Sequence, residues 1–192
     1  MHIKKATHVD SNKSLGLKRG TVELKPYTKN YAAYFEKEKQ LILHQLNDPS
    51  IKIEHIGSTA IPDLISKPII DMILGLESID LKDIESLISK LEQLGYHYMH
   101  DFNGRHFLAK GPESKRTHHL NLVIHNDPIQ WQEKIQFREL LIANPNLRQA
   151  YQEKKQELQS QFAGDRQQYT KLKSKFIQEL MSKYWPLRWF ML

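Results

Sequence analysis

The sequence predicts an α/β domain of the α+β type, in which strands and helices alternate first and helices alone follow. Three observations support this fold class. Residues 51–76 have the pattern of two strands joined by a tight turn, and residues 81–94 form the clearest amphipathic helix, directly before another strand. From residue 127 onward the apolar spacing is only helical. With 192 residues and 40% hydrophobic content, a single domain with a real core is expected.

We expect this domain to span residues 21–183, with a sheet part to about residue 126 and a helical part from about residue 127. Residues 1–20 are polar and basic, which predicts a flexible tail, with a basic arm that touches nucleic acid as the alternative. Residues 184–192 are strongly apolar. They are expected either to pack back on the domain or to form a partner contact, for example in a homodimer.

The sheet part is expected to open with a short edge strand over residues 21–24. A helix follows from Thr28, its predicted N-cap, to about residue 47, because apolar residues recur there at helical spacing. A strand over residues 51–56 comes next. The strand after it, residues 69–76, is almost wholly apolar, as expected of a strand that is buried on both faces.

The turn between these two strands has the residues of a phosphate-binding loop. Gly57 allows the positive φ or the close backbone approach that such a turn needs. Ser58 and Thr59 place two hydroxyls beside backbone N–H groups, and together these groups can cradle a phosphate. We do not expect Ser58 to be a catalytic nucleophile, because no strand-serine-helix elbow surrounds it.

Asp71 is the one charged residue within the apolar strand over residues 69–76. A carboxylate among Ile, Met and Leu side chains is costly unless it is paired or binds a metal ion. Two interpretations follow from this cost. Asp71 is either a functional group, or a structural one that pairs with Lys67 or caps a loop.

The rest of the sheet part alternates between helix and strand. We expect a helix over residues 81–94 and strands over residues 96–99, 105–110 and 118–124, with a hairpin turn at Asn103-Gly104. Asp80 is the predicted N-cap of the helix, and Gly95 is its predicted C′ residue. In the last strand His119 and Asn121 share one face, because side chains alternate along a strand.

Three helices are expected in the helical part. Asp127-Pro128 is an N-cap followed by a proline, and the first helix ends before Asn144-Pro145. The second covers about residues 146–162 and is rich in Gln, Lys and Glu, so one side of it is expected to be solvated. The segment from Asp165 to Gln168 resembles a capping box and starts the third helix.

Charge and composition favour some functions and exclude others. The formal net charge of +6 and the pI near 9.3 favour anionic ligands, although the positive charge is spread along the chain, which argues against nucleic acid. Without cysteine there is no thiol nucleophile, no disulfide and no thiolate metal site. The sequence has no signal-peptide apolar region and no apolar run of membrane length, so a cytoplasmic protein is expected.

The remaining candidates for chemistry converge if the strands over residues 51–56, 69–76 and 118–124 are neighbours. Asp71, His119 and Asn121 then meet below the Gly57-Ser58 turn, where they could hold a divalent ion such as Mg²⁺ or Mn²⁺, with Zn²⁺ as a further option. Four basic residues could flank a nucleotide or a phosphorylated small molecule: Lys67, Arg105, Arg116 and Arg138. A surface ion pair is the alternative explanation for each of them.

Long and ordered motifs in this chain resemble the signature of the GrpB family. They begin with Glu54-His-Ile-Gly-Ser-Thr-Ala-Ile-Pro and Lys67-Pro-Ile-Ile-Asp71, and they continue with Gly104-Arg-His-Phe and Arg116-Thr-His-His-Leu-Asn121. The helical part adds Phe137-Arg-Glu-Leu-Leu, Tyr151 with Lys154, and Tyr169 with Lys173-Ser-Lys-Phe-Ile. The resemblance covers about residues 21–183.

This resemblance implies a nucleotidyltransferase-like fold: a mixed β-sheet with flanking helices and a helical C-terminal extension. Members of the family occur alone or fused to dephospho-CoA kinase. In the wider superfamily, acids after a Gly-Ser turn hold two Mg²⁺ ions for in-line attack on an α-phosphate. Gly57, Ser58 and Asp71 match that pattern, but Ile73 stands where a second acid is expected.

Two functions are therefore expected as alternatives. The first is a transferase that moves a nucleotidyl or phosphoryl group onto a small molecule, with one metal ion on Asp71 and with Asp71 and His119 as its catalytic residues. The second is a non-catalytic module that binds a nucleotide or a phosphometabolite and has lost its acids.

Overall fold

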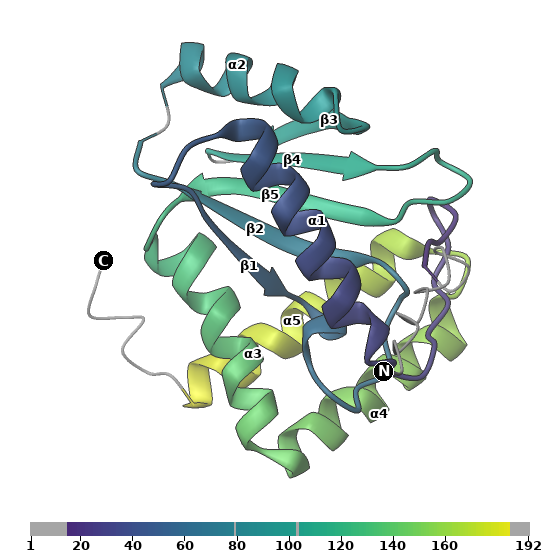
Figure 1. Cartoon of the computed structure of the whole chain (residues 1–192). Coiled ribbons are helices and arrows are strands. Elements are labelled where there is room, and N and C mark those ends of the chain that lie inside the picture. The colour runs from purple at the N-terminus through teal and green to yellow at the C-terminus, as the bar shows by residue number, and fades with distance from the viewer. Residues whose placement is uncertain (1–14, 79, 103, 185–192) are drawn as a thin grey trace, which may run out of the picture.

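The computed structural model describes residues 15–78, 80–102 and 104–184 of the chain. The elements in this part are α1 (Asn30–Leu46), β1 (Lys52–Ile56), η1 (Ser58–Ala60), β2 (Ile70–Leu76), α2 (Leu81–Glu92), β3 (Tyr96–Phe102), β4 (Arg105–Lys110), β5 (His118–Ile124), η2 (Pro128–Gln132), α3 (Glu133–Ala143), α4 (Pro145–Phe162) and α5 (Arg166–Tyr184). The predicted alternation of strands and helices, followed by a helical C-terminal part, is confirmed (Figure 1).

The described strands form one mixed sheet in the order β1-β2-β5-β4-β3. β2 and β5 run parallel, and the other neighbouring pairs are antiparallel. The register places Asp71 opposite His119 and Ile73 opposite Asn121. Because paired residues point to the same face of a sheet, these four side chains share one face, as the sequence predicts for Asp71, His119 and Asn121.

The two faces of the sheet are covered by different helices. We call the face that carries Ile70, Met72 and Leu74 the closed face, because α1 and α2 cover it and form the main core with it. The face that carries Asp71 and His119 is the open face. Figure 1 shows α1 lying across the sheet, α2 beside β3, and α3, α4 and α5 gathered together on the β1 side.

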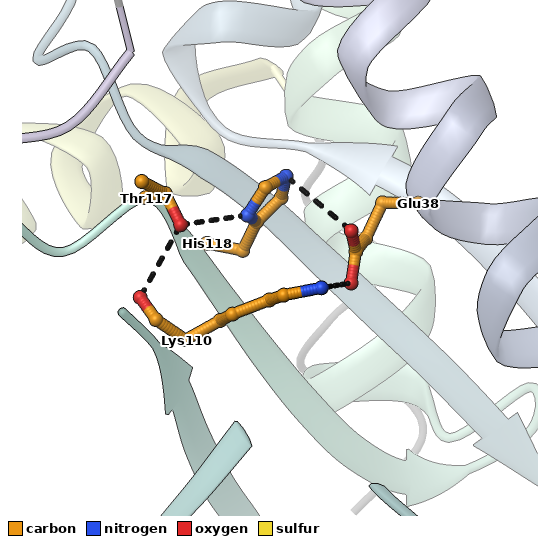
Figure 2. A network of polar contacts seen from close by, with 4 residues as sticks. All are labelled: Glu38, Lys110, Thr117 and His118. Atoms are coloured by element: carbon orange, nitrogen blue, oxygen red, sulfur yellow. Dashed lines mark hydrogen bonds and ion pairs between the residues drawn. The ribbon is translucent and has the colours of Figure 1, made fainter. Parts of the chain in front are cut away.

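The closed face contains a buried polar network, which Figure 2 shows from close by. Glu38 of α1 is only 5% exposed, and its carboxylate accepts a hydrogen bond from Lys110 of β4 at 2.7 Å. His118 of β5 lies 4.0 Å from the same carboxylate and 3.0 Å from the Thr117 hydroxyl. Burial lowers the pKa of His118 to about 4, so this ring is neutral at pH 7.

Side-chain caps start all three helices of the C-terminal part, and the sequence predicts those at Asp127 and Asp165. Asp127 accepts hydrogen bonds from two backbone N–H groups of η2, a single π-helical turn that precedes α3. Asn144 caps α4 through the N–H of Leu147 at 3.2 Å, and Asp165 accepts from the N–H of Gln168 at 3.0 Å. Among the described residues, no helix is both long enough and apolar enough to cross a membrane.

The segment before α1 differs from the prediction. Residues 21–24 form no strand, and the adjacent Lys25 forms an isolated bridge with Ser66. Residues 15–20 are packed on the domain, because Leu15 and Leu17 bury their side chains there and Leu17 pairs with Arg116. The first fourteen residues of the predicted tail, and the apolar residues 185–192, lie outside the described part of the chain.

Candidate functional site

A cavity of about 470 Å³ lies on the open face of the sheet. Its wall combines residues of β2, β3, β4 and β5 with the turn after β1 and with α3, α4 and α5. Five residues that the sequence singled out as a converging group line this cavity together: Gly57, Ser58, Asp71, His119 and Asn121. Phe107 adds an aromatic ring, whose centroid lies 5.2 Å from that of His119. The cavity therefore joins the predicted phosphate turn to the predicted carboxylate.

Glycine is required at position 57 both by the backbone conformation and by the close contact with Asp71. Its φ of +73° and ψ of −172° fall in a region that is essentially restricted to glycine. A Cβ at this position would lie 2.7 Å from Oδ2 of Asp71, which is closer than real contacts allow. The turn is therefore packed directly against the Asp71 carboxylate.

The two hydroxyls of the turn have different partners. Thr59 is 2% exposed, and its Oγ1 lies 3.0 Å from Nε2 of His55 and donates to the carbonyl oxygen of Ile69 at 3.3 Å. Thr59 therefore holds the turn in place. Ser58 and Thr59 both line the cavity, and Ser58 lies close enough to Tyr151 of α4 to influence its pKa. Because the Thr59 hydroxyl is buried and already has two partners, a ligand would meet the hydroxyl of Ser58 first.

Asp71 and His119 form the central polar pair of the cavity. Oδ1 of Asp71 lies 2.9 Å from Nδ1 of His119, and the Asp71 side chain is 37% exposed, toward the cavity. Burial opposes ionisation, but the His119 hydrogen bond and the charges of Lys67 and Lys173 outweigh it and lower the pKa of Asp71. Asp71 is therefore a carboxylate at neutral pH.

Asn121 is held by the sheet itself. Its side-chain amide nitrogen donates to the backbone oxygen of Met72 at 3.2 Å, across the β2–β5 pair. Opposite Asn121 stands Ile73, which is 1% exposed and packs with Ile56, Val123 and Trp131 of η2. The position at which the superfamily pattern would have a second acid is therefore part of an apolar cluster.

Five basic side chains line the cavity and form no ion pair with a carboxylate of the described residues: Lys67, Arg105, Lys155, Arg166 and Lys173. Within the described residues, no carboxylate oxygen lies within 4.0 Å of their side-chain nitrogens. Nε of Arg105 is buried and has no hydrogen-bond partner there. Lys134 also lines the cavity but has Glu133 at 4.0 Å. Unpaired cations in a concave site are costly, and an anionic ligand would relieve that cost.

Burial and mutual repulsion change the acidity of two of these lysines. Lys155 is 1% exposed, and burial together with the charges of Lys173 and Lys67 lowers its pKa to about 6. The pKa of Lys67 is lowered to about 8, by burial first and then by Lys173. Two tyrosines provide ring faces, with Lys155 4.8 Å from the Tyr151 centroid and Lys67 5.9 Å from that of Tyr169.

Arg116 and Arg138, which the sequence placed near the anionic substrate, do not line this cavity. Arg138 pairs with Glu54 at 2.9 Å and donates to the backbone oxygen of His55 at 2.6 Å, so it joins α3 to β1. Arg116 is 7% exposed and donates to the backbone oxygen of Gly111. Arg138 therefore forms the kind of ion pair that was its alternative explanation, whereas Arg116 is buried and bonds to a backbone oxygen instead.

The described histidines do not gather into a metal centre. Of the five histidines between residues 97 and 119, only His100 and His119 line the cavity, while His118 lies on the closed face. In the part of the chain that the structure describes, no group of three or more His, Asp or Glu side chains is placed to hold a metal ion. Asp71, His119 and Asn121 supply one carboxylate, one imidazole and one amide.

The sequence reasoning missed the contribution of α4 and α5 to this wall. Tyr151 and Lys155 lie on α4, Tyr169 and Lys173 lie on α5, and each pair is separated by four residues. A separation of four places both side chains on one face of a helix. Because Lys-rich helices usually have solvated faces, their lysine content alone does not indicate a cavity. The repeated Tyr–Lys spacing is the sequence feature that could have indicated that these helices line one.

The comparisons with known proteins agree with the motifs. A family model described as GrpB protein matches residues 21–183. The glutamate-rich protein GrpB of Alkalihalophilus pseudofirmus is 33% identical over 175 residues, which cover 88% of this chain and 99% of that protein. The protein YqkA of Bacillus subtilis is 32% identical over 168 residues, or 85% of this chain, which spans only 48% of YqkA.

Two solved structures place the fold. The crystal structure of the conserved protein GrpB from Enterococcus faecalis has a TM-score of 0.73 and 31% identity, over 85% of this chain and 99% of that one. The Cid1 poly(U) polymerase with MgGTP bound has a TM-score of 0.52 and 7% identity, over 71% of this chain and 45% of that one. The likeness to Cid1 shows a nucleotidyltransferase-like fold and no more. The chain belongs to the GrpB family.

Proposed function

We propose that the cavity binds the phosphates of a nucleotide or of a phosphorylated small molecule, and that the protein transfers a nucleotidyl or phosphoryl group to a small acceptor. The observation that carries this proposal is the set of five lysine and arginine side chains around one cavity, beside the Gly57-Ser58 turn, none of which has a carboxylate oxygen of the described residues within 4.0 Å. Lysine and arginine groups stabilise phosphate oxygens through charge-assisted hydrogen bonds. The nucleotide bound to Cid1 supports the same class of ligand.

The residues present fit one divalent ion rather than two. Mg²⁺ is often held by one or two carboxylates together with substrate phosphates, and Asp71 supplies one such carboxylate. Oδ1 of Asp71 is engaged with His119, which leaves Oδ2, the oxygen nearest to Gly57, for a ligand. A bound Mg²⁺ or Mn²⁺ would neutralise phosphate charge there. Zn²⁺ is the weaker fit, because zinc sites use at least three protein ligands and the described residues bring together no group of three or more His, Asp or Glu side chains.

The remaining roles in this proposal fall to the chain itself. Ser58 and the N–H groups of the turn bind phosphate oxygens, and the lysines neutralise the charge that a leaving diphosphate carries away. Asp71 orients the ring of His119 through Nδ1, so Nε2 is the nitrogen that would accept the acceptor's proton. The acceptor oxygen then forms its new bond to phosphorus as the bond to the leaving oxygen breaks.

Replacing one carboxylate tests the transfer reaction. A thermal-shift screen of nucleotides, CoA precursors and divalent metals identifies a ligand, and product analysis of each hit detects transfer.

The Asp71→Asn variant is expected to lose at least about a hundredfold in turnover. The Asp101→Asn variant makes the same change on exposed β3 and is expected to match wild type. Equal turnover of wild type and Asp71→Asn would exclude this mechanism.

A second function is favoured by one specific observation. Ile73 and its apolar neighbours occupy the place of the second acid, which suits a module that binds a phosphorylated ligand without catalysis. In that case a nucleotide raises the melting temperature equally with and without divalent metal, and no product forms. A melting temperature that responds to nucleotide only when Mg²⁺ or Mn²⁺ is present favours the transferase instead.

A further inference from the structure

Lys155 has no part in the metal binding or proton transfer proposed above, although it is the cavity lysine with an almost fully buried side chain, at 1% exposed. It extends from α4, donates to the backbone oxygen of Ile65, and lies over the ring of Tyr151. Charged and titratable groups approach it from other elements as well. They are Lys67 before β2, and Lys173 with Tyr169 on α5.

An ammonium group at this position is expensive. It would add a further positive charge to a desolvated site in which Lys67 and Lys173 already repel it, and no carboxylate of the described residues lies within 4.0 Å. The pKa of about 6 leaves about nine tenths of Lys155 as the neutral amine at pH 7. The amine keeps its hydrogen bond to Ile65, so the neutral form remains satisfied.

We propose, resting on the function proposed above, that Lys155 is a neutral amine in the ligand-free protein and takes up one proton from solvent when a polyphosphate anion binds in the cavity. The proton adds to the lone pair of Nζ, and no bond between nitrogen and phosphorus is formed. Lys155 thereby acts as a specificity residue for multiply charged anions, since only a strong negative potential offsets the cost of charging a third clustered lysine.

Anion binding and protonation of Lys155 favour each other, which fixes the direction of the pH dependence of affinity. The bound anion raises the pKa of Lys155 above its value in the free protein, so the complex holds more protons than its separate components. Affinity for the anion is therefore highest at low pH and falls as pH rises between the two pKa values. The decrease approaches about tenfold per pH unit within that window. Ionisation of the ligand's own phosphate acts in the opposite direction, and it is nearly complete at neutral pH.

Isothermal titration calorimetry with ATP, in EDTA and without divalent metal, measures this proton uptake. Titrations at about pH 7 in PIPES and in imidazole, two buffers with different ionisation enthalpies, give the number of protons bound per ATP. At that pH Lys67, with a pKa of about 8, is already about nine tenths protonated and contributes little. Wild type is expected to bind close to one proton per ATP.

Three variants assign the proton. Lys155→Met removes the titrating group at similar length, and Lys155→Arg carries a permanent charge, so both are expected to reduce the uptake to below about 0.2 proton. Lys154→Met removes the adjacent lysine, whose partner is the partly exposed Glu157 at 2.9 Å, and it is expected to behave as wild type. If Lys155→Met does not fold, Lys155→Arg makes the assignment alone.

The possible outcomes distinguish a failure of the Lys155 proposal from a failure of the proposed function. ATP binding by wild type without proton uptake, or undiminished uptake by Lys155→Arg, overturns the role of Lys155 and leaves the phosphate-binding function standing. Absence of ATP binding in wild type overturns both. Proton uptake in wild type that is lost in both Lys155 variants and kept in Lys154→Met supports the inference.

Discussion

His118 and His119 are adjacent in β5 and point to opposite faces of the same sheet. On the closed face, His118 lies in a network in which the Glu38 carboxylate already has Lys110 at 2.7 Å (Figure 2). On the open face, His119 holds the carboxylate of Asp71, while five lysine and arginine side chains around it have no carboxylate within 4.0 Å among the described residues. Each face pairs one carboxylate with a histidine, but the lysine of the closed-face network has a carboxylate partner as well, whereas the five basic side chains of the open face lie farther than 4.0 Å from any described carboxylate.

The difference indicates that the two faces serve different purposes. A buried charge that is paired and hydrogen-bonded costs little once the partners are in place, whereas removing one partner is strongly destabilising. Unpaired cations lower the stability of the protein and are retained where a ligand pairs them. We therefore expect mutations on the closed face to reduce stability, and mutations of the cavity cations to reduce ligand binding.

The largest expected effect is acid destabilisation through the closed face. His118, and His55 at the start of the phosphate turn, both have pKa values lowered to about 4 by burial, from 6.5 in the unfolded chain. The unfolded state therefore binds more protons, and stability is lost as pH falls from about 6.5 to 4. The loss at pH 4 is expected to approach about 3 kcal/mol for each ring.

Urea unfolding at several pH values between 7 and 4 measures this slope. The His118→Gln variant is expected to show a shallower pH dependence of the unfolding free energy than wild type, because one titrating group is gone. The His44→Gln variant, which changes an exposed ring at the end of α1, should keep the slope of wild type. A slope that His118→Gln leaves unchanged would show that this ring is not buried in its neutral form.

Removing the carboxylate of the closed-face network is expected to have the next largest effect. Glu38→Gln leaves Lys110 without its ionic partner in a mostly buried position, where its side chain is 23% exposed. We expect a loss of about 3 kcal/mol in the unfolding free energy, at the low end for a broken buried pair because Lys110 keeps some contact with water.

The matched control is Glu36→Gln on the same helix. Glu36 is exposed and accepts from Gln40 at 2.7 Å, so its substitution is expected to change the unfolding free energy by no more than about 0.5 kcal/mol. Both values come from denaturant unfolding at pH 7. Equal losses in Glu38→Gln and Glu36→Gln would contradict the distinction between a paired, buried network and an ordinary surface.

Local patterns in the sequence were enough to predict most of the fold. The apolar run of β2 with its single carboxylate, the glycine turn and the cap at Asp127 depend on neighbouring residues, and each is present as expected. Residues 15–20 differ because Leu15 and Leu17 bury themselves against the domain. This burial depends on tertiary contacts, which the composition of the segment does not reveal. The polar and basic composition therefore predicted a flexible tail.

The sheet half of the cavity could be predicted and the helical half could not. Asp71 and His119 were placed together by strand periodicity and by an assumed pairing, which the register of β2 and β5 provides. Lys155 and Lys173 lie on helices that are mostly polar, and a lysine that faces a cavity has the same sequence pattern as one that faces water. Only the packing of α4 and α5 against the open face distinguishes them.

The smallest effect on stability, and the sharpest contrast with Glu38, is expected at Lys173. Lys173→Met removes a cation that repels Lys67 and Lys155, while it also removes a charge near Asp71. We therefore expect the unfolding free energy to stay within about 1 kcal/mol of wild type, whereas affinity for ATP falls about tenfold with the loss of one charge-assisted phosphate contact.

Lys175→Met, on the exposed side of α5 beside Glu179 at 3.9 Å, should change neither quantity. Denaturant unfolding and calorimetric titration with ATP measure the two effects separately. A marked loss of stability in Lys173→Met with unchanged ATP affinity would show that the open face, like the closed one, uses its charges to hold the fold.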